Sequence, residues 1–272
     1  MAERISVIVA TYNRPDALDA VLRSLERQSD PDFEVLVADD GSTAPTKELI
    51  DVWQPRFNGR LHHVWHPDDG FRLAEIRNRA ILVASGDYCI FLDGDCIART
   101  DFVAAHRALA RRGWFVSGNR LLLSRALSER ILQEKLEPES WSFADWWRAR
   151  RAREIERLAP LVSLPLGPLR QLRRRGWRGA RGCNLAIWRS DLIAVDGFDG
   201  DFASWGGEDS DLLVRLMRTG VWRRDGRMAT GVLHLWHAEA DRSRLPENQR
   251  RLDAILASKR IRAERGLSAL RQ

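Results

Sequence analysis

Short apolar runs alternate with helical patterns through the first hundred residues. Residues 5–10 form a β-branched apolar run that predicts a strand, and residues 18–25 then repeat leucine and valine at spacings of three and four, which predicts a helix. Further strands are predicted at 35–37, 61–65 and 88–92, and a further helix at 73–84. Repeated βα units indicate a parallel sheet, whose ligands gather at the carboxyl ends of its strands.

The second half has a less regular pattern. Tryptophans stand among many arginines from Trp141 to Arg181, around the proline-interrupted apolar stretch 161–169, and we predict a helix, a mobile loop and a basic segment there. Beyond it we expect regular structure at 183–188, a turn region at 196–207, a helix through 212–217, a strand at 232–236 and a charged helix at about 247–265. No internal repeat interrupts this plan, so one α/β domain is expected.

Composition narrows the class of protein. Hydrophobic residues at 44% and charged residues at 30% exclude a disordered chain, a collagen and a disulfide-rich miniprotein. No apolar run approaches the ~20 residues of a membrane span, and the start of the chain lacks a cleavage-type site. Three cysteines without CxxC spacing fit a reducing compartment. We therefore predict a cytoplasmic protein. A further prediction is peripheral contact with the inner face of the cytoplasmic membrane.

The net charge of +6 comes almost entirely from arginine. Arginine favours planar, bidentate contact with phosphate or carboxylate, although a GC-rich genome would produce the same bias. The charge excess alone therefore decides nothing about function.

Two carboxylates, Asp93 and Asp95, flank Gly94 directly after the predicted strand 88–92. Carboxylates at i and i+2, separated by a residue that lets the backbone turn, can reach one hard divalent cation together. Such an ion could bridge diphosphate oxygens. The alternative is a plain acidic turn, and the motif alone does not separate the two.

Other polar residues close the neighbouring strands. The segment 11–14 (Thr11, Tyr12, Asn13, Arg14) closes the first strand, and Asp39 with Asp40 closes the second, so one pocket is implied at the edge that holds Asp93. Carboxylates there could accept hydrogen bonds from a uracil N–H or ribose hydroxyls, and Arg77 could contact phosphate. The alternatives are helix caps at Asn13 and Asp40 and a surface ion pair at Arg77.

Four segments in this order resemble glycosyltransferase family 2, which has a GT-A fold: SVIVATYNRP (6–15), VADDGS (37–42), RNRA (77–80) and FLDGD (91–95). In the second half, GFD (197–199) and WGGEDSDL (205–212) are similar to the acceptor-side motif of β-1,4-galactosyltransferases and bacterial chondroitin-type polymerases.

The resemblance implies a mixed, mostly parallel central sheet flanked by helices, in a single GT-A domain with an elaborated acceptor side. About 1–98 would form the nucleotide-sugar half, about 99–240 the acceptor half, and about 241–272 a C-terminal helix.

The same resemblance implies a metal-dependent, inverting transfer of a hexose from a UDP-sugar to a saccharide hydroxyl, in surface polysaccharide or lipopolysaccharide assembly. Galactose or N-acetylgalactosamine is favoured as the donor sugar. The acceptor is expected to be a saccharide or a lipid-linked saccharide. The residues implied to bind the donor are Thr11, Tyr12, Asn13, Arg14, Asp39, Asp40, Arg77, Asp93 and Gly94.

On the acceptor side, Asp209 is implied as the base that takes the proton of the attacking hydroxyl. A sugar hydroxyl is a weak nucleophile, so a carboxylate opposite the leaving diphosphate suits a single in-line displacement. Glu208 would bind acceptor hydroxyls, and Trp205 would offer its ring to a sugar, after which Gly206 and Gly207 complete the motif. The alternative is that these acids merely begin a helix, where the macrodipole favours them.

The related enzymes also imply a metal site. Asp95 and His237 are the predicted protein ligands, with diphosphate oxygens and water in the other positions. His234 is a doubtful ligand because side chains three apart on a strand face opposite ways. A carboxylate and imidazole shell suits Mn²⁺ as well as Mg²⁺, and Mn²⁺ is favoured.

Two other classes remain open. Arg170 to Arg181 suggests an arginine-rich module for nucleic acid or an anionic surface, which leaves the acidic motifs unexplained. A sugar nucleotidyltransferase could use the same acids with a triphosphate.

Trp146 and Trp147 beside the arginines of 148–153 predict an interfacial patch for anionic lipid or, alternatively, a solvated helix face. His62, His63, His66 and His106 are predicted to have no functional role.

Overall fold

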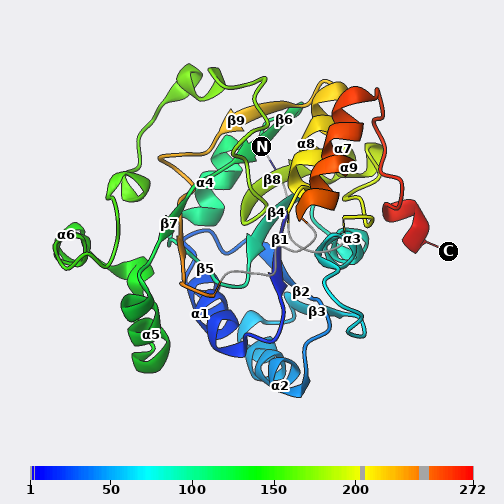
Figure 1. Ribbon diagram of the computed structural model, residues 1–272. Helices are drawn as coiled ribbons and strands as arrows, with labels where there is room; N and C mark the ends of the chain where they lie inside the picture. Colours follow the sequence, from blue (N-terminus) through cyan, green and yellow to red (C-terminus); the bar gives the residue numbers. More distant parts are fainter. Residues whose placement is uncertain (1, 3, 203–205, 239–244, 272) are drawn as a thin grey trace.

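The computed structural model describes residues 2, 4–202, 206–238 and 245–271. Its centre is a seven-stranded sheet in the order β3-β2-β1-β4-β8-β6-β9, flanked by helices (Figure 1). The strands are β1 (Ile5–Thr11), β2 (Phe33–Asp39), β3 (Leu61–Trp65), β4 (Tyr88–Asp93), β6 (Trp114–Ser117), β8 (Asn184–Trp188) and β9 (Trp222–Asp225).

Strand direction follows the βα pattern of the sequence. The strands β3, β2, β1 and β4 are mutually parallel, and β8 is antiparallel to both of its neighbours, β4 and β6. β6 and β9 are parallel to each other. The predicted mixed, mostly parallel sheet is therefore confirmed.

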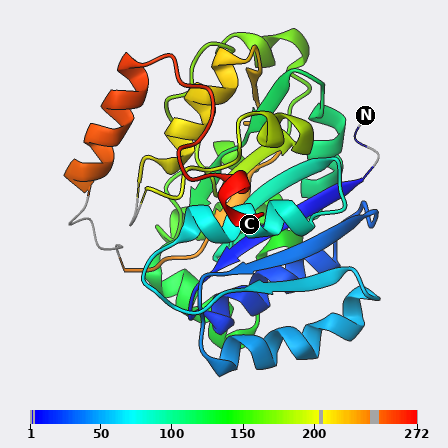
Figure 2. The ribbon, with the colours of Figure 1, turned by 90° about the vertical axis from the view of Figure 1, so that its right-hand side faces the viewer.

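Each face of the sheet carries its own apolar cluster, because successive strand side chains point to opposite faces. Val7 and Val9 belong to one cluster with Leu22 of α1 (Pro15–Glu26), whereas Ile8 belongs to the other with Ile76 of α3 (Leu73–Val83). α2 (Ala44–Trp53) and α4 (Phe102–Leu109) add to the first cluster, and α7 (Arg189–Ala194) and α8 (Glu208–Arg218) to the second. Figure 2 shows α3 and the C-terminal segment on the second face.

A second, three-stranded sheet lies beside the first and joins both halves of the chain. Its order is β5 (Cys96–Ala98), β10 (Val232–His234) and β7 (Arg120–Leu122). A third apolar cluster packs this sheet against α5 (Arg125–Glu134) and α6 (Phe143–Arg151). Because β5 follows Asp95 directly, this small sheet brings residues near 234 to the acidic turn.

Several predicted boundaries differ from the structure. The strand predicted at 232–236 ends at His234. The helix predicted at about 247–265 is α9 (Leu245–Ala257), and it stops earlier because the chain beyond Ser258 turns back to bind Asp199. Of the segment 141–181, α6 confirms the predicted helix, and the rest contains the short 3-10 helices η3 (Ala159–Leu161) and η4 (Gly167–Gln171).

Two expectations from composition can be compared with the structure. Cys89, Cys96 and Cys183 are free and buried. Among the described residues, no helix combines the length and apolar character that a bilayer span requires.

Candidate active site

The polar residues that close the parallel strands meet at one edge of the sheet, as the sequence predicts. Thr11 at the end of β1 pairs in register with Asp39 at the end of β2, and Ala10 pairs with Asp93 at the end of β4. The segments 11–14, 39–40 and 93–95 are therefore neighbours.

Gly94 turns the chain between the two carboxylates at this edge. Its N–H donates to the Ala10 carbonyl at 2.7 Å, and a Cβ on Gly94 would lie 2.8 Å from the same oxygen. Only glycine allows this approach to β1. The segment is a tight turn, as the alternative interpretation holds, but its two carboxylates serve different partners: Asp93 contacts Arg77, and Asp95 faces two histidines.

Arg77 is the cation of the site, and it is buried, with a side chain 2% exposed. Its Nη2 donates to Asp93 Oδ1 at 3.0 Å and its Nη1 to Asp209 Oδ1 at 3.2 Å. Its guanidinium carbon also lies 5.3 Å from the centre of the Phe198 ring. The structure differs from the alternative interpretation of Arg77, because the ion pair is buried instead of lying on the surface. The contact with phosphate stays a prediction.

Asp209 stands in the first turn of α8, directly after two glycines. Gly206 and Gly207 both have φ of +101°, a conformation that favours glycine, and so lead the chain into the helix. Asp209 Oδ2 accepts the Gly182 N–H at 2.6 Å. A Cβ on Gly182 would lie 2.5 Å from Asp209 Oδ1 and 2.7 Å from Arg77 Nη1, so this glycine lets the segment before β8 approach the ion pair. Gly182 belongs to none of the motifs that the sequence predicts to be functional.

Glu208 has a different environment from Asp209. Its side chain is 9% exposed, against 20% for Asp209, and its Oε2 has no hydrogen-bond partner among the described residues. Burial, together with the charge of Asp209, raises the pKa of Glu208 to about 8 despite Arg77. Burial likewise raises the pKa of Asp93 to about 6. The raised pKa favours the protonated form of Glu208, in which its carboxyl group can donate a hydrogen bond.

Asp95 faces two imidazoles. Its Oδ2 lies 3.4 Å from His237 Nε2, and its Oδ1 lies 3.6 Å from His234 Nε2. The argument against His234 is wrong, because β10 ends at this residue and the strand alternation does not continue to His237. The structure therefore brings both histidines to Asp95.

The residues around Asp95 could hold a divalent cation: ligand atoms of Asp95, Cys96 and His234 lie within 4.8 Å of one another, and His237 faces the other oxygen of Asp95. His237 Nδ1 donates to the Ala238 carbonyl at 2.7 Å, so Nε2 is the ring nitrogen that remains to face Asp95. Burial lowers the pKa of His234, which favours the neutral form that binds metals. The buried Cys96 thiol lies 3.6 Å from Asp95 Oδ1 and is a further potential ligand in the cluster with His234.

Asp39 and Asp40 are each paired with a histidine that the sequence analysis set aside. Asp39 Oδ2 lies 2.9 Å from His63 Nε2, and Asp40 Oδ1 lies 2.7 Å from His66 Nε2. Asp40 also accepts the Arg72 N–H at 2.9 Å, at the start of α3. Both carboxylates are buried, so His63 and His66 orient this part of the edge.

The side chains of residues 11–14, at and after the end of β1, differ in their partners and in their exposure to solvent. Asn13 Oδ1 accepts the Thr43 N–H at 2.9 Å at the start of α2, which supports a structural role for this amide. Arg14 pairs with Asp16 at 2.9 Å, and the half-exposed Tyr12 donates to Asp68. Thr11 Oγ1 is buried and has no hydrogen-bond partner among the described residues.

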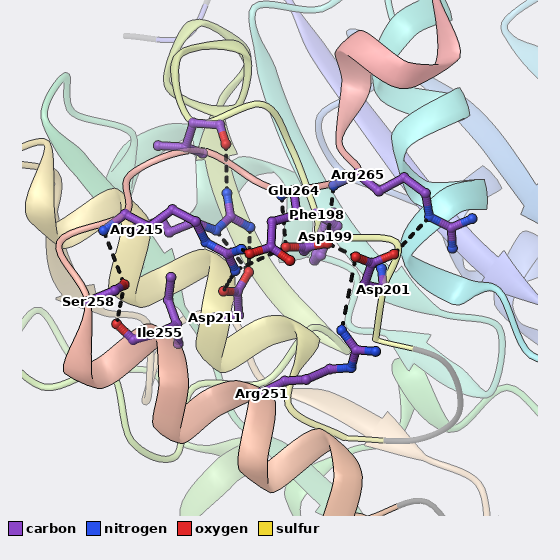
Figure 3. Close-up of polar contacts among 12 residues, drawn as sticks. Phe198, Asp199, Asp201, Asp211, Arg215, Arg251, Ile255, Ser258, Glu264 and Arg265 are labelled. Atoms are coloured by element: carbon purple, nitrogen blue, oxygen red, sulfur yellow. Dashed lines mark hydrogen bonds and ion pairs between the residues drawn. The ribbon is translucent and has the colours of Figure 1, made fainter.

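The Gly197-Phe198-Asp199 motif forms hydrogen bonds with α3 and with the C-terminal segment. Asn78, next to Arg77, donates to the Phe198 carbonyl and accepts its N–H, both at 2.8 Å. Asp199 accepts the Glu264 N–H at 3.0 Å, and Asp211 pairs with Arg215 at 2.7 Å in the middle of α8 (Figure 3). These contacts hold the beginning of α8, and with it Asp209, against α3 and the C-terminal segment.

A pocket of about 410 Å³ opens beside the beginning of α8. It lies between Gly206 and Gly207, the segment 177–179, and α9, where Leu252 and Asn248 face it. Trp205, the predicted sugar-stacking residue, lies outside the described residues.

The sheet order, the carboxylates at the strand ends and the helical second-half motif define a GT-A fold. A family model described as glycosyl transferase family 2 matches residues 6–175, and a second, described as the N-terminal domain of galactosyltransferase, matches residues 171–237. The chain belongs to glycosyltransferase family 2.

Curated relatives agree with this assignment. Validoxylamine A glucosyltransferase of Streptomyces hygroscopicus subsp. jinggangensis is 31% identical over 240 residues, which cover 84% of this chain and 54% of the relative. Chondroitin synthase of Escherichia coli is 26% identical over 248 residues, which cover 83% of this chain and 34% of that protein. The chain thus spans about half or less of the length of these relatives.

Solved structures share the fold. S. aureus TarS residues 1–349 in complex with UDP has a TM-score of 0.63 at 15% identity, covering 98% of this chain and 68% of the solved TarS chain. GalNAc-T7 with UDP, GalNAc and Mn²⁺ has a TM-score of 0.61 at 16% identity, covering 87% of this chain and 44% of GalNAc-T7.

Proposed function

We propose that this protein is a metal-dependent, inverting glycosyltransferase that moves a hexose from a UDP-sugar to a saccharide hydroxyl. The observation that carries the proposal is the Arg77 bridge, which joins Asp93, at the end of a donor-side strand, to Asp209 of the second-half motif. In this proposal, about 1–98 bind the donor and about 99–240 bind the acceptor.

Asp209 is the proposed general base. Arg77 and the Gly182 N–H hold its carboxylate in place, whereas the raised pKa of Glu208 favours the protonated form of that side chain. The acceptor hydroxyl transfers its proton to the Asp209 carboxylate as its oxygen bonds to the anomeric carbon, and the bond from that carbon to the diphosphate oxygen breaks. A single displacement of this kind inverts the anomeric configuration. Glu208 donates a hydrogen bond to an acceptor oxygen.

Asp95, His234 and His237 are the proposed metal ligands. They would hold a divalent cation, with Mn²⁺ favoured over Mg²⁺, whose positive charge would offset the negative charge that develops on UDP. TarS is solved with UDP, and GalNAc-T7 with UDP, GalNAc and Mn²⁺, which supports a nucleotide and a metal as ligands of this protein. Thr11 to Arg14, Asp39 and Asp40 would line the nucleoside side, which is where their strands end.

Nucleotide binding tests the donor class. Calorimetry with Mn²⁺ present should give tighter binding of UDP than of ADP or GDP, and Asp95→Ala should remove the Mn²⁺-dependent part of that affinity. Asp51→Ala, at an exposed ion pair on α2, is the matched control. Equal affinity for the three nucleotides would reject the UDP-sugar proposal.

Product analysis tests the reaction and the donor sugar. We favour galactose or N-acetylgalactosamine because residues 171–237 match the galactosyltransferase model. The relatives include a glucosyltransferase and a chondroitin synthase, so the screen should include UDP-glucose, UDP-N-acetylglucosamine and UDP-glucuronic acid. UDP release from one of these sugars is expected.

Pyrophosphate release from a nucleoside triphosphate would instead identify a nucleotidyltransferase. Acceptors from surface polysaccharide or lipopolysaccharide, including lipid-linked saccharides, are the first to test.

A further inference from the structure

Helix α6 lies at the margin of the fold, away from the large sheet (Figure 1). One side of the helix is anchored: Trp146 and Ala149 are 5% and 3% exposed, and the Trp146 ring lies 4.9 Å from that of Trp141. These residues belong to the cluster that packs on the small sheet. The other side of α6 is therefore held in a fixed orientation toward solvent.

That outer side carries large aromatic residues. Phe143 is 63% exposed and Trp147 is 47% exposed, and their spacing of four places them next to each other on the helix. Arg151, four residues further, holds its guanidinium carbon 4.8 Å from the centre of the Trp147 ring. Neighbouring exposed aromatic side chains are typical of an interaction surface.

Positive charge gathers in the same part of the chain. Residues 143–178 contain ten arginines, no lysine and three acidic residues, a net charge of +7, whereas the whole chain carries +6. The other residues together are thus slightly acidic. The basic character of this protein therefore resides in one segment of 36 residues.

Several of these charges are available to a ligand. Arg148 pairs with Asp145 at 2.8 Å, but Arg150, Arg151 and Arg153 form no ion pair within the described part of the chain. All three side chains are exposed. We call Phe143, Trp147, Arg150, Arg151 and Arg153 the α6 surface.

Aliphatic side chains continue the apolar character beyond the helix. Leu164, Leu169 and Leu172 are 42%, 58% and 79% exposed, in the segment around η4. Leucine does not stack on nucleic-acid bases as aromatic residues do, and it gains free energy in a lipid interface. Exposed leucines interspersed with arginines therefore favour a membrane over a nucleic acid as the partner.

We propose that the α6 surface, with the basic segment that follows it, binds anionic lipid bilayers. Phe143 and Trp147 enter the interface between headgroups and acyl chains, where amphipathic aromatic rings are favoured, and the unpaired arginines contact lipid phosphates. This binding requires no sugar donor and no metal. A failure of the lipid proposal therefore leaves the proposed transferase function untouched, and the reverse is also true.

Vesicle flotation tests the proposal. The chain should float with phosphatidylcholine vesicles that contain about 30 mol% phosphatidylglycerol and should remain unbound with phosphatidylcholine alone, and salt should weaken the binding. The double variant Phe143→Ser/Trp147→Ser should bind anionic vesicles at least about tenfold more weakly. The matched control is Val52→Ser/Val83→Ser, which removes two apolar side chains that are 69% and 58% exposed on α2 and α3, and it should bind like the parent. Equal binding by both double variants would overturn the proposal.

A fluorescent label locates the contact. The three native cysteines are buried, so an environment-sensitive dye can be attached to Ala144→Cys on α6 or to Lys47→Cys on α2, both at exposed positions. Anionic vesicles should shift the emission of the α6 label to the blue and leave the α2 label unchanged. Equal shifts, or none, would overturn the proposal. Duplex DNA that competes with the vesicles and binds the Phe143→Ser/Trp147→Ser variant as well as the parent would assign the segment to nucleic acid and also overturn it.

Discussion

The Arg77 guanidinium donates to Asp209 across 132 residues of chain, with 3.2 Å between Nη1 and Oδ1, while its other terminal nitrogen donates to Asp93. A planar fork with donors on two nitrogens can hold two carboxylates at once, and its burial leaves little room for either to turn away. Arg77 thus fixes the position of the proposed base relative to the donor-side acids.

Replacing Arg77 by lysine should impair both stability and turnover. Lysine keeps the positive charge but cannot span two carboxylates, so one of them loses its partner inside the protein. Loss of one partner of a buried pair costs up to about 3–5 kcal/mol, and turnover should fall by at least about tenfold as Asp209 loses its orientation. Chemical denaturation and UDP release measure the two effects. Arg79→Lys, at a partly exposed pair on the same helix, is the control, and comparable behaviour of both variants would show that Arg77 has no special role.

Asp209→Asn should separate binding from chemistry. An amide keeps the size of the side chain and one of its two accepting oxygens, but it cannot take the proton of the acceptor. Turnover should therefore fall by ~10²-fold or more, with the affinity for UDP unchanged. Single-turnover assays and calorimetry give the two numbers, and Asp51→Asn on α2 provides a matched loss of charge. Unchanged turnover would remove Asp209 from the mechanism.

Gly182→Ala should displace the ion pair by sterics alone. The added methyl group would come within 2.5 Å of Asp209 Oδ1 and 2.7 Å of Arg77 Nη1, so one of these side chains must move. We expect lower turnover with a smaller change in UDP affinity. Gly176→Ala is the matched control in the same segment, because its nearest neighbour would be 3.4 Å away. Parental turnover in Gly182→Ala would show that the close approach has no catalytic consequence.

The first half of the fold was predictable because its apolar periods are unambiguous. The strand Leu61–Trp65 matches its prediction at both ends, and α3 differs by one residue. β9 was missed because its sequence, WRRD, has no apolar alternation. Its buried Arg223 is stabilised by carbonyl groups of residues 176 and 178, which are distant in sequence.

The grouping of the acidic residues was predictable too, because parallel strands all end on the same side of the sheet. The partners of those residues were not predictable, because they come from elements whose position depends on tertiary packing. Arg77 reaches Asp209 only because α3 and α8 pack into the same apolar cluster, and His234 reaches Asp95 only because β10 pairs with β5.

Substitution of His234 and His237 tests the metal site. If both rings bind the cation, His234→Ala and His237→Ala should each weaken Mn²⁺-dependent UDP binding by about tenfold or more, as expected for the loss of a ligand or its support. Binding of UDP without metal should be unchanged. Manganese titration monitored by electron paramagnetic resonance reports the affinity directly, and His62→Ala, at a half-exposed ring on β3, is the control. Parental behaviour of His234→Ala would restore the original prediction that His237 is the histidine ligand.

The elevated pKa of Glu208 predicts how stability changes with pH. Its pKa is about 8 in the folded chain and near the ordinary 4.5 when unfolded, so between these values the folded state holds a proton that the unfolded state has released. Stability therefore falls as the pH rises through this window, because the unfolded state binds fewer protons. Glu208→Gln removes the titration, so its stability relative to the parent should increase from pH 5 to pH 8. Thermal unfolding at several pH values measures the difference, with Glu129→Gln at an exposed ion pair as the control. Parallel pH profiles for the parent and Glu208→Gln would mean that Glu208 is ionised in the folded protein, and the assignment of Asp209 as the only base of the pair would lose its support.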